Sequence, residues 1–262
     1  MRIDEQLRAV FSQRPCGLLT DIDGTISPFA RVPDEAVVTP IARGRLQQLE
    51  QQIAVVAAIS GRPAAVAARM IDLPELIYIG NHGLETWQHD RAVIASEALP
   101  YVDTIRAVLR DAQTRIALRG VAFEDKGATA SVHYRQADNH AAAARLIGAV
   151  LEPLAREAGL RLTSGHLVWE IRPPIAIDKG TAARDLIRRH QLRGAVFIGD
   201  DRSDADAFAM LRQLRQRGEC ATLNIGVDTP QTPQIVRDEA DVLVPGVSGV
   251  EHVLSRIIEI VR

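Results

Sequence analysis

One stretch decides the fold of this 262-residue chain: Leu18-Leu19-Thr20-Asp21-Ile22-Asp23-Gly24-Thr25-Ile26-Ser27-Pro28. Apolar residues lead into two carboxylates, and Gly24 and Thr25 then break the run, which predicts a buried parallel strand ending in a tight loop. Ligands of α/β sheets bind just outside the carboxyl ends of the strands, so Asp21 and Asp23 stand where chemistry is usually done. Two close carboxylates repel each other and need a cation or a shared proton. Taken alone, the stretch fits an Asp-rich turn equally well.

The composition excludes several classes of protein. A net charge of −2 gives no electrostatic reason to expect binding to nucleic acid or to an anionic membrane. No apolar run reaches the length of a membrane span, and residues 1–6 lack the apolar core of a signal peptide. The two cysteines, Cys16 and Cys220, are far apart and read as buried free thiols in a reducing compartment. We therefore expect a cytoplasmic protein.

The first hundred residues alternate between predicted helices and short, continuous apolar runs. This order, β-α-β-α-β after a first helix, predicts a parallel sheet with right-handed crossovers. Thr39 followed by Pro40 is a typical helix start, and Arg31–Asp34 is expected to be a loop. The expected elements are helices at 3–12, from 40 onward and through 70–71, and strands at 18–22, 53–59 and 76–79.

From about residue 100 the pattern changes to alternating polar and apolar residues between two helices. The order α-β-β-α-β-β predicts an antiparallel sheet with its helices on one face, which leaves the other face open to solvent or ligand. We expect residues 100–174 to form an inserted cap domain. Its expected elements are helices at 102–118 and 139–158 and strands at 121–126, 129–135, 160–163 and 166–172.

The first pattern then returns, so residues 1–99 and 175–262 are expected to form one α/β core. A helix is expected to open at 178–180, and a buried strand at 195–199 leads into an acidic cluster at 200–204. Strands at 220–225 and 241–244 and a C-terminal helix complete this core.

Three further motifs accompany the first. Ser60-Gly61-Arg62 offers a hydroxyl and backbone N–H groups at a helix start, which suits a phosphate, although alone it is more often a turn. Lys179 could neutralise an anion, or be an ordinary solvated lysine. Gly199-Asp200-Asp201-Arg202-Ser203-Asp204 places three carboxylates at a strand end, where they fit a hard cation such as Mg²⁺ or a helix N-cap.

The order of the four motifs resembles that of the haloacid dehalogenase-like (HAD) phosphatases, over nearly the whole chain. Within that superfamily the details look like the trehalose-6-phosphate phosphatases. The matching stretches are Asp23–Pro28, Ser60–Arg62, Asn81-His82-Gly83-Leu84-Glu85, Glu124-Asp125-Lys126, His133-Tyr134-Arg135, Glu170–Pro173, Lys179-Gly180 and Gly199–Phe208. The resemblance implies a Rossmann-like parallel-sheet HAD core with an inserted α+β cap.

The resemblance also implies a mechanism. Asp21 would attack phosphorus and form an aspartyl-phosphate, and Asp23 would act as general acid and base. Mg²⁺ would be held by Asp21, the backbone carbonyl of Asp23 and Asp200, while Ser60 and Lys179 would stabilise the transferring oxygens. Asp201 and Asp204 would orient this set. The implied substrate contacts are Gly24, Thr25, Gly61, Arg62, Asn81 and His82 in the core, and Glu124, Lys126, Arg135 and Glu170 in the cap.

The expected reaction is Mg²⁺-dependent hydrolysis of trehalose 6-phosphate to trehalose and phosphate, with a trehalose-6-phosphate synthase as a possible pathway partner. Three alternatives stay open. The chain could be a phosphatase of another sugar phosphate, such as sucrose-phosphate or glucosylglycerol-phosphate. It could be a phosphomutase, or a non-catalytic domain that regulates a synthase. The intact motif residues argue against the last.

Overall fold

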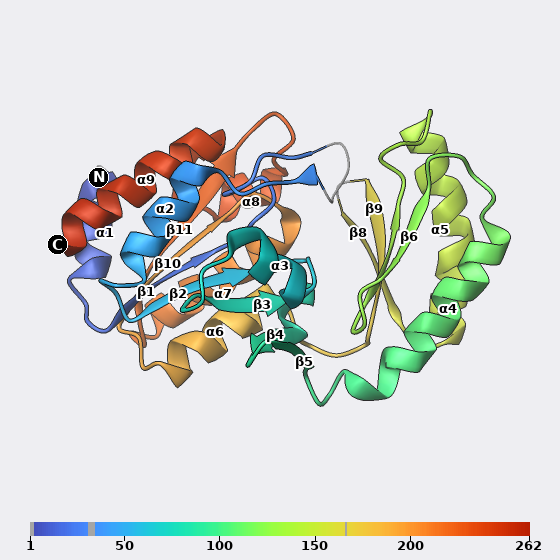
Figure 1. Cartoon of the computed structure of the whole chain (residues 1–262), viewed down its shortest axis with the longest axis horizontal. Helices are drawn as coiled ribbons and strands as arrows, with labels where there is room; N and C mark the ends of the chain where they lie inside the picture. The colour runs from blue at the N-terminus through green and yellow to red at the C-terminus, as the bar shows by residue number, and fades with distance from the viewer. Residues whose placement is uncertain (1–2, 31–34, 166) are drawn as a thin grey trace. The chain divides into compact units, whose positions relative to one another are not determined.

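A computed structural model of the chain describes residues 3–30, 35–165 and 167–262, and these residues form two compact units. The first comprises the described residues up to Ala92 together with Ile177–Arg262, and the second is Val93–Ala176 (Figure 1). The loop predicted at 31–34 and the strand start predicted at His166 lie outside the described residues. Among the described residues, no helix is long and apolar enough to cross a membrane.

The first unit is built on an eight-stranded sheet in which neighbouring strands from β12 to β3 are parallel and β4 is antiparallel to β3. This confirms the predicted α/β class. In order across the sheet, the strands are β12 (Val242–Pro245), β11 (Ala221–Asp228), β10 (Gly194–Gly199), β1 (Cys16–Thr20), β2 (Val55–Ile59), β3 (Ile77–Gly80), β4 (Glu85–Gln88) and β5 (Arg91–Ile94).

Helices cover both faces of this sheet and create two apolar cores. Successive residues of β1 alternate between them: Leu18 packs in one core and Leu19 in the other. In the second core the rings of Phe197 and Phe208 meet edge to face, with centroids 5.8 Å apart. The first core is formed with α1 (Ile3–Phe11), α2 (Pro40–Leu49), α3 (Ala64–Ile71) and α9 (Gly246–Val261), the second with α6 (Lys179–Arg189), α7 (Arg202–Gln216) and α8 (Gln234–Glu239).

The register of the central strands places their carboxyl ends at one edge of the sheet. Thr20, the last residue of β1, pairs with Ile198 of β10 on one side and with Ala58 of β2 on the other. The residues that follow these strands must therefore meet at this edge.

The second unit is a four-stranded antiparallel sheet packed against two helices (Figure 1). Residues 130, 132 and 171 point into its apolar core, together with the helices. Glu124, Ser131 and Glu170 lie in register across three strands and belong to the opposite face. The elements are α4 (Val102–Arg115), α5 (His140–Glu157) and, in sheet order, β6 (Ala122–Asp125), β7 (Ala130–His133), β9 (Val168–Arg172) and β8 (Arg161–Gly165).

The hairpin of β4 and β5 and the short helix α8 were not anticipated from the sequence. His89 and Asp90 turn the hairpin with positive φ values of 50° and 57°. Two-residue hairpin turns of this kind are usually Asn-Gly, Asp-Gly or Gly-Gly, and His-Asp is none of these pairs. Thr39 is the helix cap that the sequence predicts: its side chain accepts a hydrogen bond from the N–H of Ala42.

Candidate active site

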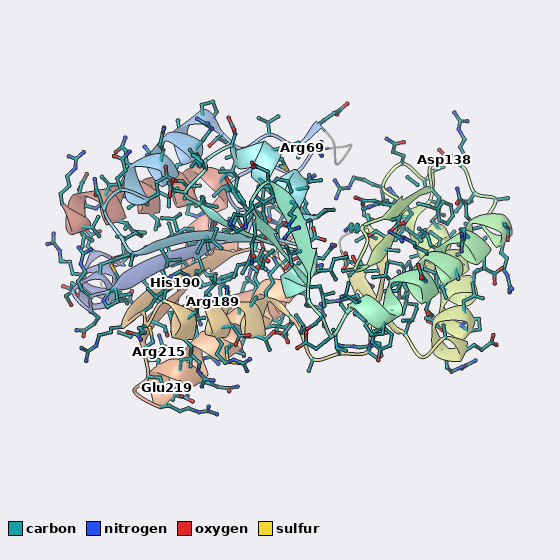
Figure 2. All side chains as sticks on the ribbon, turned by 60° about the horizontal axis from the view of Figure 1, so that its bottom comes forward. Arg69, Asp138, Arg189, His190, Arg215 and Glu219 are labelled. Carbon is teal, nitrogen blue, oxygen red and sulfur yellow. The ribbon has the colours of Figure 1, made fainter. Side chains whose placement is uncertain are left out.

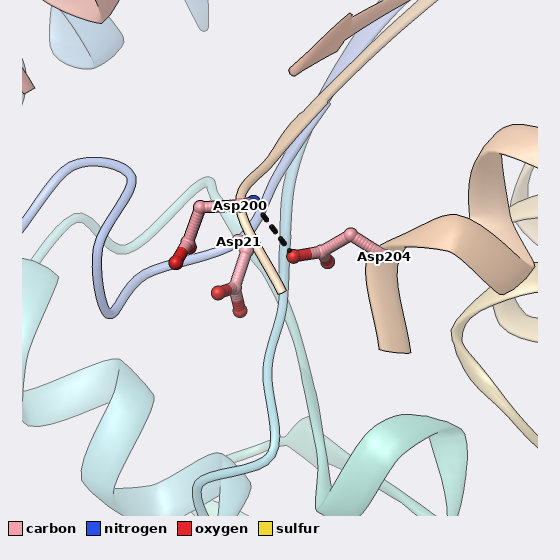
Figure 3. A group of neighbouring side chains, drawn as sticks. All are labelled: Asp21, Asp200 and Asp204. Carbon is pink, nitrogen blue, oxygen red and sulfur yellow. Dashed lines mark hydrogen bonds between the residues drawn. The ribbon is translucent and has the colours of Figure 1, made fainter. Parts of the chain in front are cut away.

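Asp21, Asp200 and Ser60 follow the carboxyl ends of β1, β10 and β2, where the register brings them to one edge of the sheet. All three are buried. The N–H of Asp21 donates to the carbonyl of Ile198 at 2.9 Å, which extends the pairing of β1 with β10 by one bond. Figure 3 shows Asp21 and Asp200 beside Asp204, which comes from the first turn of α7.

Lys179 is the cation at the centre of this acidic cluster. Its Nζ lies 2.7 Å from Asp204 Oδ1 and 2.9 Å from Asp21 Oδ1, and the side chain is 1% exposed. The lysine opens α6, and a capping box between Asp178 and Thr181 fixes that helix start. Burial alone lowers the pKa of Lys179, but Asp204 and Asp21 raise it well above its ordinary value. The lysine is therefore a fixed positive charge.

Asp204 is held entirely by N–H donors. Its Oδ2 accepts from the backbone of Asp200 at 2.9 Å and of Asp201 at 3.0 Å, and its Oδ1 accepts from Lys179. A Cβ on Gly199 would lie 2.3 Å from Asp204 Cγ, so glycine is needed there. Asp201 in turn caps α7, because its Oδ1 accepts from the N–H groups of residues 203 and 204. These contacts orient the loop that carries Asp200.

The loop after Asp23 closes over Asp200. Thr25 Oγ1 donates to Asp200 Oδ1 at 3.0 Å. Gly24 has a φ of +82°, and a Cβ there would lie 2.3 Å from Asp200 Oδ2. Both residues were expected among the substrate contacts, and the structure places them against a candidate metal ligand.

The donor set of the cluster fits a hard divalent cation. Carboxylate oxygens of Asp21, Asp200 and Asp204 all lie within 4.8 Å of one another. Burial raises the pKa of Asp21 to about 6, despite the nearby lysine, and it raises that of Asp200 well above its ordinary value. One buried lysine therefore leaves negative charge uncompensated when these acids are ionised, and oxygen ligands are what Mg²⁺ prefers. Since N–H donors already hold both oxygens of Asp204, Asp21 and Asp200 are the better candidate ligands.

Buried charge is confined to few places in the first unit. Charged side chains such as Arg69, Arg189 and Glu219, labelled in Figure 2, are exposed. Lys179 and Asp204 are at most 1% exposed by contrast. Buried charges are retained only where partners or a bound ion compensate them, which favours a functional reading of the cluster.

Asp23, the expected acid and base, is held by Arg62. The guanidinium Nε and Nη2 donate to Asp23 Oδ2 and Oδ1 at 2.5 Å and 2.7 Å, and the Asp23 side chain is 28% exposed. Arg62 was expected to contact substrate. In this arrangement both oxygens of Asp23 accept from Arg62, so the two side chains form a bidentate ion pair.

The loops after β2 and β3 are bound to each other. Backbone N–H groups of Asn81 and His82 donate to the carbonyls of Arg62 and Ser60, both at 2.9 Å. A Cβ on Gly61 would lie 2.6 Å from His82 Cε1, so the imidazole rests against this glycine. The structure thus brings all five predicted residues of these loops together.

Glu85 is a buried residue of this region to which the sequence pattern gave no role. Its carboxylate binds the Ala64 N–H and the Asn81 side chain. The only signal was its place at the end of the stretch Asn81–Glu85.

In the second unit, three predicted residues form one polar network. Lys126 Nζ lies 3.2 Å from Glu170 Oε1 and 4.0 Å from Glu124 Oε2. Two residues absent from the predicted site join them: His133 Nε2 lies 2.8 Å from Glu124 Oε2, and Ser131 Oγ donates to Glu170 Oε1 at 3.4 Å. Strand alternation could have found both, since they share the face of Glu124 and Glu170. Arg135 follows β7, and its carbonyl contacts the His140 ring.

Comparison with known proteins yields matches along most of the chain. A family model described as trehalose-phosphatase matches residues 19–237. The trehalose-phosphate phosphatase of Mycobacterium marinum is 36% identical over 197 residues, covering 72% of this chain and 49% of that protein. A probable trehalose-phosphate phosphatase of rice is 30% identical, covering 81% and 63%. The C-terminal domain of the Candida albicans trehalose-6-phosphate phosphatase shares the fold, with a TM-score of 0.82, 17% identity and 98% of both chains covered. The chain spans about half the length of the mycobacterial relative.

Replacing Asp200 by Asn is expected to stabilise the metal-free protein. Folding raises the pKa of this acid, so its ionisation lowers stability as pH rises above the unfolded value of about 3.9. In chelator at pH 7, Asp200→Asn should therefore gain about 0.5–2 kcal/mol, a common size for stabilising changes, and Mg²⁺ should no longer raise its Tm. Thermal unfolding with and without Mg²⁺ measures this.

Asp241→Asn is the matched control, because Arg215 and the Asn224 N–H outweigh burial and lower the pKa of Asp241. It should lose stability in both conditions. A metal-free Asp200→Asn protein less stable than wild type would contradict the electrostatic account.

Proposed function

The chain belongs to the trehalose-phosphatase family, and we propose that it hydrolyses trehalose 6-phosphate to trehalose and phosphate. The observation that carries this proposal is the buried cluster in which Lys179 contacts Asp21 and Asp204 beside Asp200. Phosphate release from a panel of sugar phosphates, with trehalose 6-phosphate among them, tests it.

Asp21 is the proposed nucleophile. Its carboxylate oxygen forms a bond to phosphorus while the bond from phosphorus to the sugar oxygen breaks. Asp23 gives its proton to the departing sugar oxygen. A water molecule then attacks the aspartyl-phosphate, Asp23 takes a proton from it, and phosphate leaves with Asp21 regenerated. Lys179 favours the first step because it holds Asp21 Oδ1 at 2.9 Å and keeps that oxygen in place.

Asp21, Asp200 and the backbone carbonyl of Asp23 are the proposed ligands of Mg²⁺. When bound, the cation offsets the charge of the carboxylates and of the phosphoryl oxygens. Ser60 and Lys179 provide the donors that stabilise the transferring oxygens. Asp201 and Asp204 keep the lysine and the Asp200 loop in place.

The second unit is proposed to bind the sugar. Glu124, Lys126 and Glu170 offer acceptors and donors suited to hydroxyl groups, and they are already ordered by one another. Arg135 is a further proposed contact on this unit. In the first unit, the proposed substrate contacts are Gly24, Thr25, Gly61, Arg62, Asn81 and His82.

A phosphatase of another sugar phosphate remains the principal alternative, because the residues of the first unit would be the same. A phosphomutase is distinguished by isomerised sugar in place of free phosphate. We also propose a cytoplasmic location, supported by two buried free cysteines, with a trehalose-6-phosphate synthase as supplier of the substrate.

Asp21→Asn should abolish turnover while the protein stays folded. An amide is a far weaker nucleophile than a carboxylate, and Asn keeps the shape of the side chain. Phosphate release and circular dichroism on the same sample measure the two effects. Turnover retained in carefully purified Asp21→Asn protein would reject the nucleophile.

Removal of divalent cations should abolish activity, and added Mg²⁺ should restore it. The reason is that a phosphate dianion cannot approach Asp21 and Asp200 while their charges are uncompensated. The assay is phosphate release after exhaustive chelation and after Mg²⁺ is returned. Full activity in the chelated enzyme would exclude the metal site.

Truncating Glu124, Lys126 or Glu170 to Ala should lower kcat/KM for trehalose 6-phosphate by about ten- to a hundredfold. A hydrogen bond to a charged group contributes roughly 1.5–3 kcal/mol, and about 1.4 kcal/mol is one decade in kcat/KM. Hydrolysis of para-nitrophenyl phosphate should barely change, because it has no sugar to hold. Glu157→Ala, an exposed position at the end of α5, is the control. Equal losses on both substrates would show that these residues do not determine sugar specificity.

A further inference from the structure

We propose that Glu85 is a positioning residue, which fixes the two loops that carry Ser60, Arg62 and Asn81 and thereby sets the rate of phosphoryl transfer. The inference rests on the proposed function for its kinetic part. Its structural part concerns the unliganded protein alone.

Glu85 is the first residue of β4. Its side chain is buried, and both carboxylate oxygens accept hydrogen bonds. The residue is 4% exposed. Its Oε1 accepts from the backbone N–H of Ala64 at 2.5 Å, and its Oε2 accepts from Asn81 Nδ2 at 2.9 Å. One carboxylate thus joins the start of α3 to the loop after β3.

The bond to Ala64 replaces an ordinary helix cap. The N-cap position of α3 is Pro63, whose side chain makes no capping hydrogen bond. Ala64 is the first helical residue, so its N–H has no partner within the helix. A carboxylate at this position also interacts favourably with the helix dipole. Glu85 therefore anchors α3 at the point where the loop of Ser60 and Arg62 enters the helix.

The space between the two loops leaves no room for adjustment. A Cβ on Gly80 would lie 2.2 Å from the Ala64 nitrogen and 2.7 Å from the Arg62 carbonyl oxygen. The Asn81 N–H donates to that same carbonyl, and the Ser60 N–H donates to Ile79. A shift of Ala64 away from Glu85 would therefore move the Arg62 backbone as well.

This displacement reaches the reacting groups through Arg62. Its guanidinium holds both oxygens of Asp23, the proposed acid and base. Ser60, a proposed phosphate contact, lies two residues before Arg62, and the Arg62 N–H approaches Ser60 Oγ at 3.3 Å. Glu85 is not one of the proposed reacting groups, so its effect should pass through Ser60, Arg62 and Asn81 and appear mainly in catalysis.

Glu85→Gln tests the proposal with the least change of shape. Glutamine keeps one acceptor and presents an NH₂ group where the second was, so it cannot serve Ala64 and Asn81 as arranged here. We expect kcat to fall tenfold or more on both trehalose 6-phosphate and para-nitrophenyl phosphate, with a smaller change in KM. The equal loss on both substrates separates Glu85 from the sugar-binding residues.

Hydrogen exchange detects the structural part without any substrate. Amides of residues 60–66 should exchange faster in Glu85→Gln than in wild type, while those of β10 and of residues 122–172 should not change. Glu75→Gln makes the same chemical change at an exposed position just before β3 and should alter neither measurement. Glu85→Asp, which keeps the charge but is one methylene shorter, serves if Glu85→Gln does not fold. In Glu85→Asp, the amides of residues 60–66 should likewise exchange faster than in wild type, and kcat should lie between those of wild type and Glu85→Gln.

Wild-type kcat in these variants, or a loss of kcat with unchanged exchange at 60–66, would overturn the positioning role. A wild-type protein that releases no phosphate from any substrate would refute the proposed function instead. The exchange measurement would still test whether Glu85 fixes the loop of residues 60–66.

Discussion

The charge balance around Lys179 is the constraint on which the first unit depends. A lysine 1% exposed is tolerable only because Asp21 and Asp204 lie within 3 Å of it, and those acids are tolerable only because the lysine is there. The balance is incomplete, since burial still raises the pKa of Asp21 to about 6. The protein atoms of the cluster are thus short of positive charge, and this favours the binding of a cation.

The sheet register turns residues far apart in sequence into one site. The sequence has 178 residues between Asp21 and Asp200. Because Thr20 pairs with Ile198, both acids nevertheless follow their strands at the same edge of the sheet. The glycines that border them serve the same end. Gly24 and Gly199 lie so close to Asp200 and Asp204 that a single Cβ would collide with either carboxylate. Backbone packing therefore fixes the acids before any ligand arrives.

Much of this arrangement could be predicted from sequence, because buried strands and the polar residues that end them leave strong local patterns. The class of fold, the parallel strands and the positions of Asp21, Ser60 and Asp200 at strand ends follow from such patterns. What failed depends on tertiary contacts. The ion pair of Arg62 with Asp23 and the bonds of Glu85 join segments whose spacing carries no signal. The hairpin at His89 was not predicted for a local reason, because its His-Asp turn is not one of the usual dipeptides, such as Asn-Gly or Asp-Gly.

The two units differ in how deeply their charged groups are buried and in how these charges are balanced. In the first, ionised groups are almost fully buried and their balance leaves a deficit that a metal can fill. In the second, Lys126 lies between Glu124 and Glu170, whose side chains are 40% and 11% exposed, so one ammonium faces two carboxylates that are partly open to solvent. A network of this kind presents fixed donors and acceptors, which suits a partner rich in hydroxyl groups. For the proposed substrate, the phosphate and the sugar require chemically distinct groups, and the two units supply them separately. Residues of the second unit can therefore change while the buried cluster around Lys179 is kept.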